Sequence, residues 1–66
     1  MTVIKFRKLD EMEQLEAIWE AKLLGSREDE SFKVNTYQID DFFVDEYFDK
    51  SRGGVRVRFV AMEKFQ

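Results

Sequence analysis

The sequence predicts an α+β domain in which one helix packs on a mainly antiparallel sheet, with the element order β-α-β-β-β. Apolar residues recur at spacings of three and four between residues 10 and 24, as they do on one face of a helix. Three later runs are rich in β-branched and aromatic residues and are separated by turn-forming residues. All three glycines fall at the ends of these predicted elements, and no proline interrupts any of them.

The chain has 66 residues and is expected to form a single domain over residues 1–66. A chain of this length buries only about 60% of its unfolded surface, so its stability depends on dense packing or on a partner. Cysteine and histidine are absent, so we expect no disulfide, no metal site and no cofactor. Seven Phe, two Tyr and one Trp are therefore expected to build the core, unless a second subunit completes it.

An N-terminal strand is predicted over residues 2–8. Ile4 and Phe6 share one face of this segment, while Lys5 and Arg7 share the other. Such alternation is typical of a strand that is buried on one side. We expect this strand at an edge of the sheet.

A helix is predicted over residues 10–24. Asp10 offers an N-cap, and Glu13 stands where a capping box has its second polar side chain. Gly25 follows directly, as expected for the left-handed residue after a helix C-terminus. An apolar stripe, expected to pack on the sheet, consists of Met12, Leu15, Ile18, Trp19 and Leu23.

A polar connection is predicted over residues 26–31, and three strands follow it. The strands cover residues 32–39, 42–50 and 55–62. Asp40 and Asp41 tolerate turn conformations and are expected to join the first two strands. The segment SRGG, residues 51–54, is expected to join the last two as a hairpin connection.

Pairing across these turns sorts the side chains onto two faces. In the first hairpin Ile39 is expected opposite Phe42 and Tyr37 opposite Val44. In the second, a tip between Arg52 and Gly53 places Lys50 opposite Val55, Asp49 opposite Arg56, Phe48 opposite Val57 and Tyr47 opposite Arg58. The face expected to meet the helix then holds Tyr37, Ile39, Phe42, Val44, Phe48, Val55, Val57, Phe59 and Ala61.

Glu46 also falls on that face, opposite Phe59, where an unpaired carboxylate is costly. We expect it at the rim of the helix footprint, where Lys33 or Lys22 can meet it. A β-bulge that shifts the register is the second interpretation, and a functional buried acid is the third.

The opposite face carries an apolar patch that one helix cannot also cover. Such a patch on a small domain suggests a partner. We therefore expect a protein-interaction module that self-associates, as a homodimer, through this face or an edge strand. The contact residues expected are Phe43, Tyr47, Val60 and Met62. The alternative is an ordinary half-exposed sheet face shielded by arginine stems.

Binding of single-stranded RNA or DNA is the alternative function. Lys50, Arg52, Arg56 and Arg58 cluster around one hairpin, beside the rings of Phe43 and Tyr47. Basic residues beside exposed rings hold single strands by phosphate contact and stacking. Asp45 and Asp49 share that face and are expected to neutralise the arginines, and the net charge is −3, so nucleic acid is an unlikely partner.

The composition also argues against an enzyme. Histidine, the commonest acid–base residue, and cysteine, the strongest nucleophile at neutral pH, are both absent, and no phosphate-binding glycine pattern occurs. The segment MTVIKFRKLDEMEQ has no apolar run before a small-residue cleavage site, so we expect no signal peptide. No apolar run reaches the roughly 18 residues of a membrane span, and a cytoplasmic location is expected.

The stretch YQIDDFFVDEYF, residues 37–48, resembles a motif in a family of small, uncharacterised bacterial proteins. In that family a helix with a segment like LEAIWE precedes a strand pair built around YQID and an aromatic-rich run. The resemblance covers residues 9–25 and 33–59, and it implies a helix followed by paired strands. It implies no activity and no binding residue, and the position of Glu46 is usually apolar in such proteins.

Overall fold

The computed structural model describes residues 1–64 and contains two helices followed by four strands. The elements are α1 (Val3–Lys8), α2 (Glu11–Trp19), β1 (Lys22–Glu28), β2 (Phe32–Ile39), β3 (Phe42–Asp49), the short 3-10 helix η1 (Lys50–Arg52) and β4 (Val55–Met62). The strands form one antiparallel sheet in the order β1-β2-β3-β4. The predicted α+β class is confirmed, but the predicted order and the single helix are wrong.

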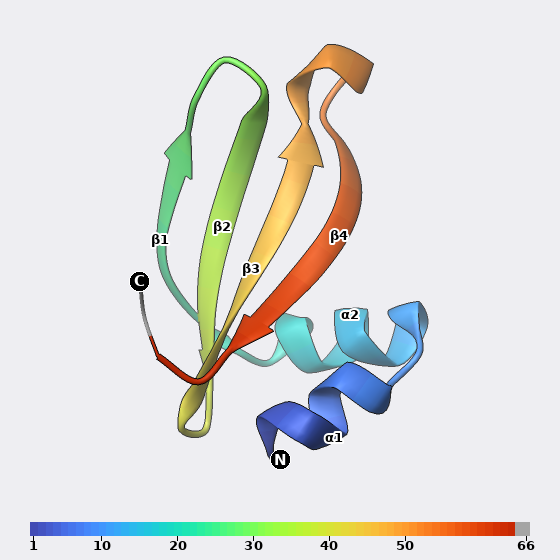
Figure 1. Ribbon diagram of the computed structural model, residues 1–66, viewed down its shortest axis with the longest axis vertical. Coiled ribbons are helices and arrows are strands. Elements are labelled where there is room, and N and C mark those ends of the chain that lie inside the picture. Colours follow the sequence, from blue (N-terminus) through green and yellow to red (C-terminus); the bar gives the residue numbers. More distant parts are fainter. Residues whose placement is uncertain (65–66) are drawn as a thin grey trace.

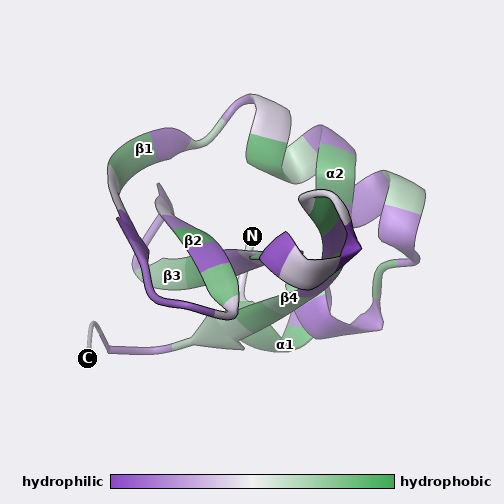
Figure 2. Cartoon of the chain, turned by 90° about the horizontal axis from the view of Figure 1, so that it is seen from above, coloured by the Kyte–Doolittle hydropathy of each residue, from purple (hydrophilic) through white to green (hydrophobic). Residues whose placement is uncertain are grey.

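Both helices lie beside one end of the sheet, away from the loop that joins β1 to β2 and from η1 (Figure 1). Figure 2 shows both helices on the same side of the central strands, where α1 contacts β4 and α2 contacts β2. Only one face of the sheet is therefore covered by helices. Neither helix in the described part of the chain is long and apolar enough to span a membrane.

The N-terminal segment forms α1 instead of the predicted strand. The Thr2 hydroxyl accepts a hydrogen bond of 3.1 Å from the Lys5 amide and caps this helix. Val3 and Phe6 are buried, whereas Ile4 points to solvent. Over six residues, apolar positions fit a spacing of three as well as an alternation, so periodicity alone did not distinguish helix from strand.

Helix α2 begins as predicted and ends early. The Asp10 carboxylate accepts from the Glu13 amide at 2.9 Å, and Glu13 accepts from the Asp10 amide at 3.2 Å, which completes the capping box. The helix ends at Trp19 with Glu20 as its C-cap, so Gly25 is not a helix terminator and instead lies in β1.

Strand β1 takes residues 26–28, the first half of the predicted polar connection, together with the end of the predicted helix. It pairs with β2 and carries a bulge between Leu23 and Gly25. The true turn is short, because the Asp29 carboxylate accepts 2.8 Å hydrogen bonds from the amides of Ser31 and Phe32. These bonds lower the pKa of Asp29 and close the first hairpin.

The first aromatic hairpin, β2–β3, has the predicted register, with Ile39 opposite Phe42. Asp40 adopts a φ of 52° in its turn, a conformation that Asp tolerates. The β3–β4 hairpin keeps Tyr47 opposite Arg58, as predicted. A bulge next to this pair then places Phe48 opposite Arg56 and Asp49 opposite Val55, so the predicted pairing near the tip is wrong.

The core forms between the two helices and the covered sheet face. Its buried residues are Val3, Phe6, Ile18, Phe42 and Val44. The Phe6 ring lies 5.8 Å from that of Phe42 and 6.3 Å from that of Phe59. Helix α1 thus supplies the central ring, and Ile18 is the only buried residue of the α2 stripe.

Two expectations about the core are corrected by this packing. Met12, Trp19 and Leu23, expected to pack on the sheet, are exposed. Val55 and Val57, expected on the face that meets the helix, are exposed near the β3–β4 tip. The bulge after Tyr47 is the reason, because it places Val55 opposite Asp49 on the side away from the helices and turns Arg56, which lies between the two valines, towards the helices instead.

Candidate protein-interaction surface

The sheet face that turns away from the helices is called the outer face. Directly opposite residues in an antiparallel pair share a face. The register pairs Val34 with Tyr47, Thr36 with Asp45, Gln38 with Phe43, Asp45 with Val60 and Phe43 with Met62. All four predicted contact residues, Phe43, Tyr47, Val60 and Met62, therefore lie together on the outer face.

A polar group crosses the middle of the outer face. Asp45 is only 6% exposed, and its carboxylate accepts from the Thr36 hydroxyl at 2.5 Å and from the Arg27 guanidinium at 3.0 Å. Arg27 also donates to the Thr36 hydroxyl at 3.3 Å. The hydrogen bond to Asp45 raises the pKa of Arg27. The buried charge is compensated and ties β1 to β3.

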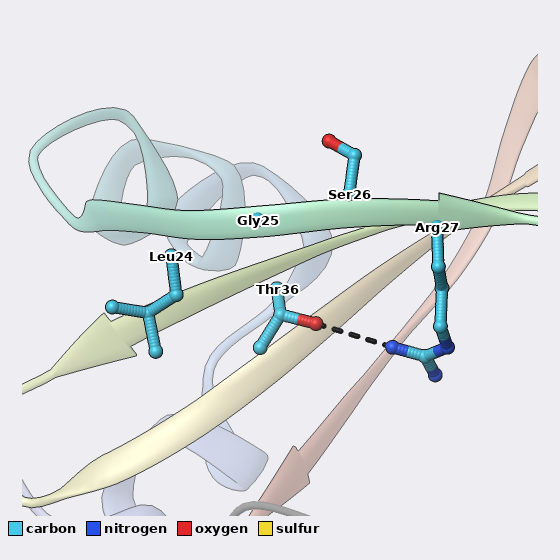
Figure 3. Close-up of a pocket in the computed structure, with 5 residues that line it drawn as sticks. All are labelled: Leu24, Gly25, Ser26, Arg27 and Thr36. Atoms are coloured by element: carbon cyan, nitrogen blue, oxygen red, sulfur yellow. Dashed lines mark hydrogen bonds between the residues drawn. The ribbon is translucent and has the colours of Figure 1, made fainter.

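A shallow hollow lies beside this group. Leu24, Arg27 and Thr36 point to one side of β1, whereas Ser26 points to the other (Figure 3). The Ser26 hydroxyl donates to the Asn35 side chain at 2.6 Å, on the face toward the helices. The Thr36 hydroxyl and the Arg27 guanidinium, which both line the hollow, bind Asp45 and so connect neighbouring strands.

The aromatic part of the outer face centres on Tyr47. Its ring meets the Phe32 ring edge-on at 5.7 Å, and the Arg58 guanidinium lies 4.7 Å above it. Phe43, Val60 and Met62 follow towards the Asp40 end of the sheet, with Val60 exposed and the other two half-buried. This end of β3 and β4 carries the apolar patch.

The four basic residues expected to contact nucleic acid do not share one face. The bulge turns Arg56 towards the helices, where it pairs with Glu11 at 3.2 Å and lies 5.2 Å above the Phe59 ring. Lys50 pairs with Glu28 at 3.1 Å, and Arg58 lies above Tyr47. Arg52 is exposed in η1. The expected basic cluster is therefore split between the two faces.

The two acids expected to balance these arginines have other partners. Asp45 binds Arg27, a residue that was predicted to lie in a loop. The Asp49 carboxylate accepts from the amide and the hydroxyl of Ser51, at 2.9 and 2.6 Å, and caps η1. Neither acid pairs with Arg56 or Arg58 in the described part of the chain.

Glu46 lies on the covered face and is 4% exposed, so it is not at the rim. Its carboxylate accepts from the Tyr37 hydroxyl at 3.2 Å. Burial, and then the charge of Glu46, raise the pKa of Tyr37. The expected pairing with Lys22 or Lys33 is wrong. No group of three acids that could hold a metal ion occurs among the described residues.

Helix α2 presents a second apolar surface that the sequence interpretation placed in the core. Trp19 is 84% exposed and Met12 65% exposed, and with Leu15 they line a shallow hollow bordered by Glu16 and Glu20. The helix packs through Ile18 and the half-buried Ala17, while Gln14 donates to the Phe6 carbonyl at 3.1 Å. Of the predicted stripe, only Ile18 lies in this contact with the core.

Comparison with known proteins returned no family model, no curated protein and no solved structure that matches this chain. The resemblance based on YQID and the aromatic-rich run therefore stays a prediction.

Proposed function

We propose that this protein is an interaction module that forms a homodimer through its outer face. The observation that supports this proposal is the placement of both helices on one side of a four-stranded sheet. The opposite side keeps an apolar patch, formed on neighbouring strands by Phe43, Tyr47, Val60 and Met62. Burial of such a patch against a second copy removes apolar surface from water.

Features of both sheet edges favour dimerisation through the outer face over pairing of edge strands. Strand β1 is exposed along its whole length, but it carries a bulge and the charged residues Lys22, Arg27 and Glu28. On β4, the Ala61 carbonyl already accepts a 2.9 Å hydrogen bond from the Arg7 guanidinium. Bulges, charges and occupied carbonyls are devices that hinder the addition of a further strand.

The dimensions of the chain suit an interface of standard size. A stable dimer commonly buries about 800 Å² on each partner. The chain exposes 4834 Å², and its two longer extents are 32 and 23 Å. A contact of about 800 Å² would take about one sixth of the 4834 Å² that the chain exposes, and two sheet faces can stack as in a β-sandwich.

Tyr47 is well suited to be a contact residue of the dimer, because its ring is already held in place. Phe32 supports one edge and Arg58 covers one side, so the ring loses little freedom on binding. Asp45 is neutralised by Arg27, so burial of the outer face does not enclose an unpaired charge.

Amide spectra recorded during dilution test this proposal. We expect concentration-dependent shifts in β3 and β4 of the wild type, because these strands carry the contact residues. Val60→Lys should abolish the shifts while the chain stays folded. Ile4→Lys makes the same change at an exposed site on α1 and should leave them intact. Shifts that persist in Val60→Lys would contradict the proposal.

A further inference from the structure

Helix α2 carries an apolar ridge on its solvent side, formed by Met12, Leu15 and Trp19. These residues follow the i, i+3, i+7 spacing with which helices contact partner helices and grooves. Trp19 is 84% exposed, although its burial would stabilise a small domain considerably. All three line a shallow hollow, in which Met12 and Trp19 are exposed and Leu15 is half-buried.

The charges that border this ridge are uncompensated. Within residues 1–64, the carboxylates of Glu16 and Glu20 have no hydrogen-bond or ion-pair partner, whereas Glu11 pairs with Arg56 and Glu13 closes the capping box. No basic residue occurs in the last turn of α2, and Glu20 is its C-cap. Negative charge at the negative end of a helix dipole is unfavourable, so these two acids do not serve the stability of α2.

We propose that the α2 ridge binds a basic amphipathic helix of another protein. The apolar residues of that helix would cover Met12, Leu15 and Trp19, and its lysines or arginines would pair with Glu16 and Glu20. In a contact between two copies of the ridge, the glutamates of one copy would repel those of the other. An anionic membrane would repel them as well. The charge pattern thus selects a basic peptide over both alternatives.

The apolar ridge and the two glutamates beside it are expected to contribute to binding in different ways. A Trp side chain supplies a large contact area with few rotatable bonds, so Trp19 is expected to be the anchor of the contact. Exposed carboxylates mainly speed association and fix the orientation of the partner. Binding should therefore weaken as salt screens the charges.

A designed helical peptide provides the probe. It has leucines at helical spacing on one face and lysines elsewhere, with a fluorescent label for anisotropy titration against the full chain. We expect saturable binding, weaker at higher salt, with a blue shift in the emission of Trp19, the only tryptophan. A peptide with the same leucines and glutamates in place of the lysines should not bind. Absence of binding at low salt, or equal binding of both peptides, would overturn the proposal.

Variants of the chain localise the contact. Trp19→Ala and the double change Glu16→Lys with Glu20→Lys should each weaken binding by about tenfold or more. Glu30→Lys with Glu63→Lys makes the same change in net charge at exposed sites and should leave affinity within about twofold. Equal weakening by the two double changes would assign the effect to net charge and overturn the proposal.

Three further measurements separate the ridge from the outer face and the peptide from other occupants. Val60→Lys should bind the peptide like the wild type, because the outer face lies on the other side of the sheet from the helices. Loss of the homodimer in Trp19→Ala would assign the ridge to a second copy. Binding to anionic phospholipid vesicles in preference to the lysine peptide would assign it to a membrane. Either result would overturn the proposal.

Discussion

The Tyr37 hydroxyl donates a 3.2 Å hydrogen bond to the buried carboxylate of Glu46 on the face that the helices cover. The two residues are diagonal neighbours, because Tyr37 stands opposite Val44 and Glu46 opposite Asn35. A phenol from the adjacent strand therefore accommodates the one acid that the strand pattern directs into the core. Glu46 therefore has a hydrogen-bond donor without a lysine at the rim.

Tyr37→Phe should lower the free energy of unfolding by about 1–3 kcal/mol, because it leaves a buried carboxylate without its donor. Urea denaturation measures this change. The double variant Tyr37→Phe with Glu46→Leu should recover most of the loss, since removal of both partners leaves no unsatisfied polar group. If Tyr37→Phe alone kept the stability of the wild type, this hydrogen bond would not contribute to the free energy of unfolding.

Stability should also fall at alkaline pH. Burial and then the charge of Glu46 raise the pKa of Tyr37 above its ordinary value of 10.0, so the folded chain holds this proton more tightly than the unfolded chain does. The resulting stabilisation is fully present below about pH 10 and is lost as pH rises through the raised pKa of the folded state.

Urea midpoints measured from about pH 9 to about pH 11 test this dependence. Tyr37→Phe is the matched control, because it removes the group but keeps every other titrating side chain, Tyr47 included. We expect the wild type to lose stability more steeply than the variant over this range. Parallel curves would mean that Tyr37 titrates alike in both states.

Phe6→Ala and Trp19→Ala should differ sharply in their effect on stability. Phe6 is 1% exposed between the rings of Phe42 and Phe59, and its truncation should cost about 3–5 kcal/mol. Trp19 stands in solvent, so its truncation should change stability by no more than about 0.5 kcal/mol. Chemical denaturation followed by circular dichroism compares them. Equal losses would mean that the α2 stripe, and not α1, fills the core.

Local patterns predicted some of the fold correctly. The capping box of Asp10 and Glu13 and the hairpin at Asp40 each depend on residues close in sequence. Part of the outer face was also predicted correctly, because alternation along β3 and β4 sorts side chains without knowledge of the packing, but the bulge moves Arg56 off this face. Phe43, Tyr47, Val60 and Met62 share a face for this reason.

Features that depend on distant contacts could not be predicted in the same way. The orientation of α2 follows from Phe6, which occupies the core position that its stripe was expected to fill. Strand β1 depends on pairing with β2, through contacts such as Arg27 with Thr36. The bulge after Tyr47 overrides a favourable charge pairing of Asp49 with Arg56, because Arg56 instead reaches Glu11 on α2.

Sedimentation equilibrium of the wild type beside Val60→Lys tests the proposed homodimer most directly. The wild type should approach twice the mass of the chain as concentration rises to high micromolar levels, because two outer faces then bury their apolar patches. Val60→Lys should sediment as one chain over the same range, with an unchanged circular dichroism spectrum. A wild type that sediments as a single chain at every concentration would contradict self-association through the outer face.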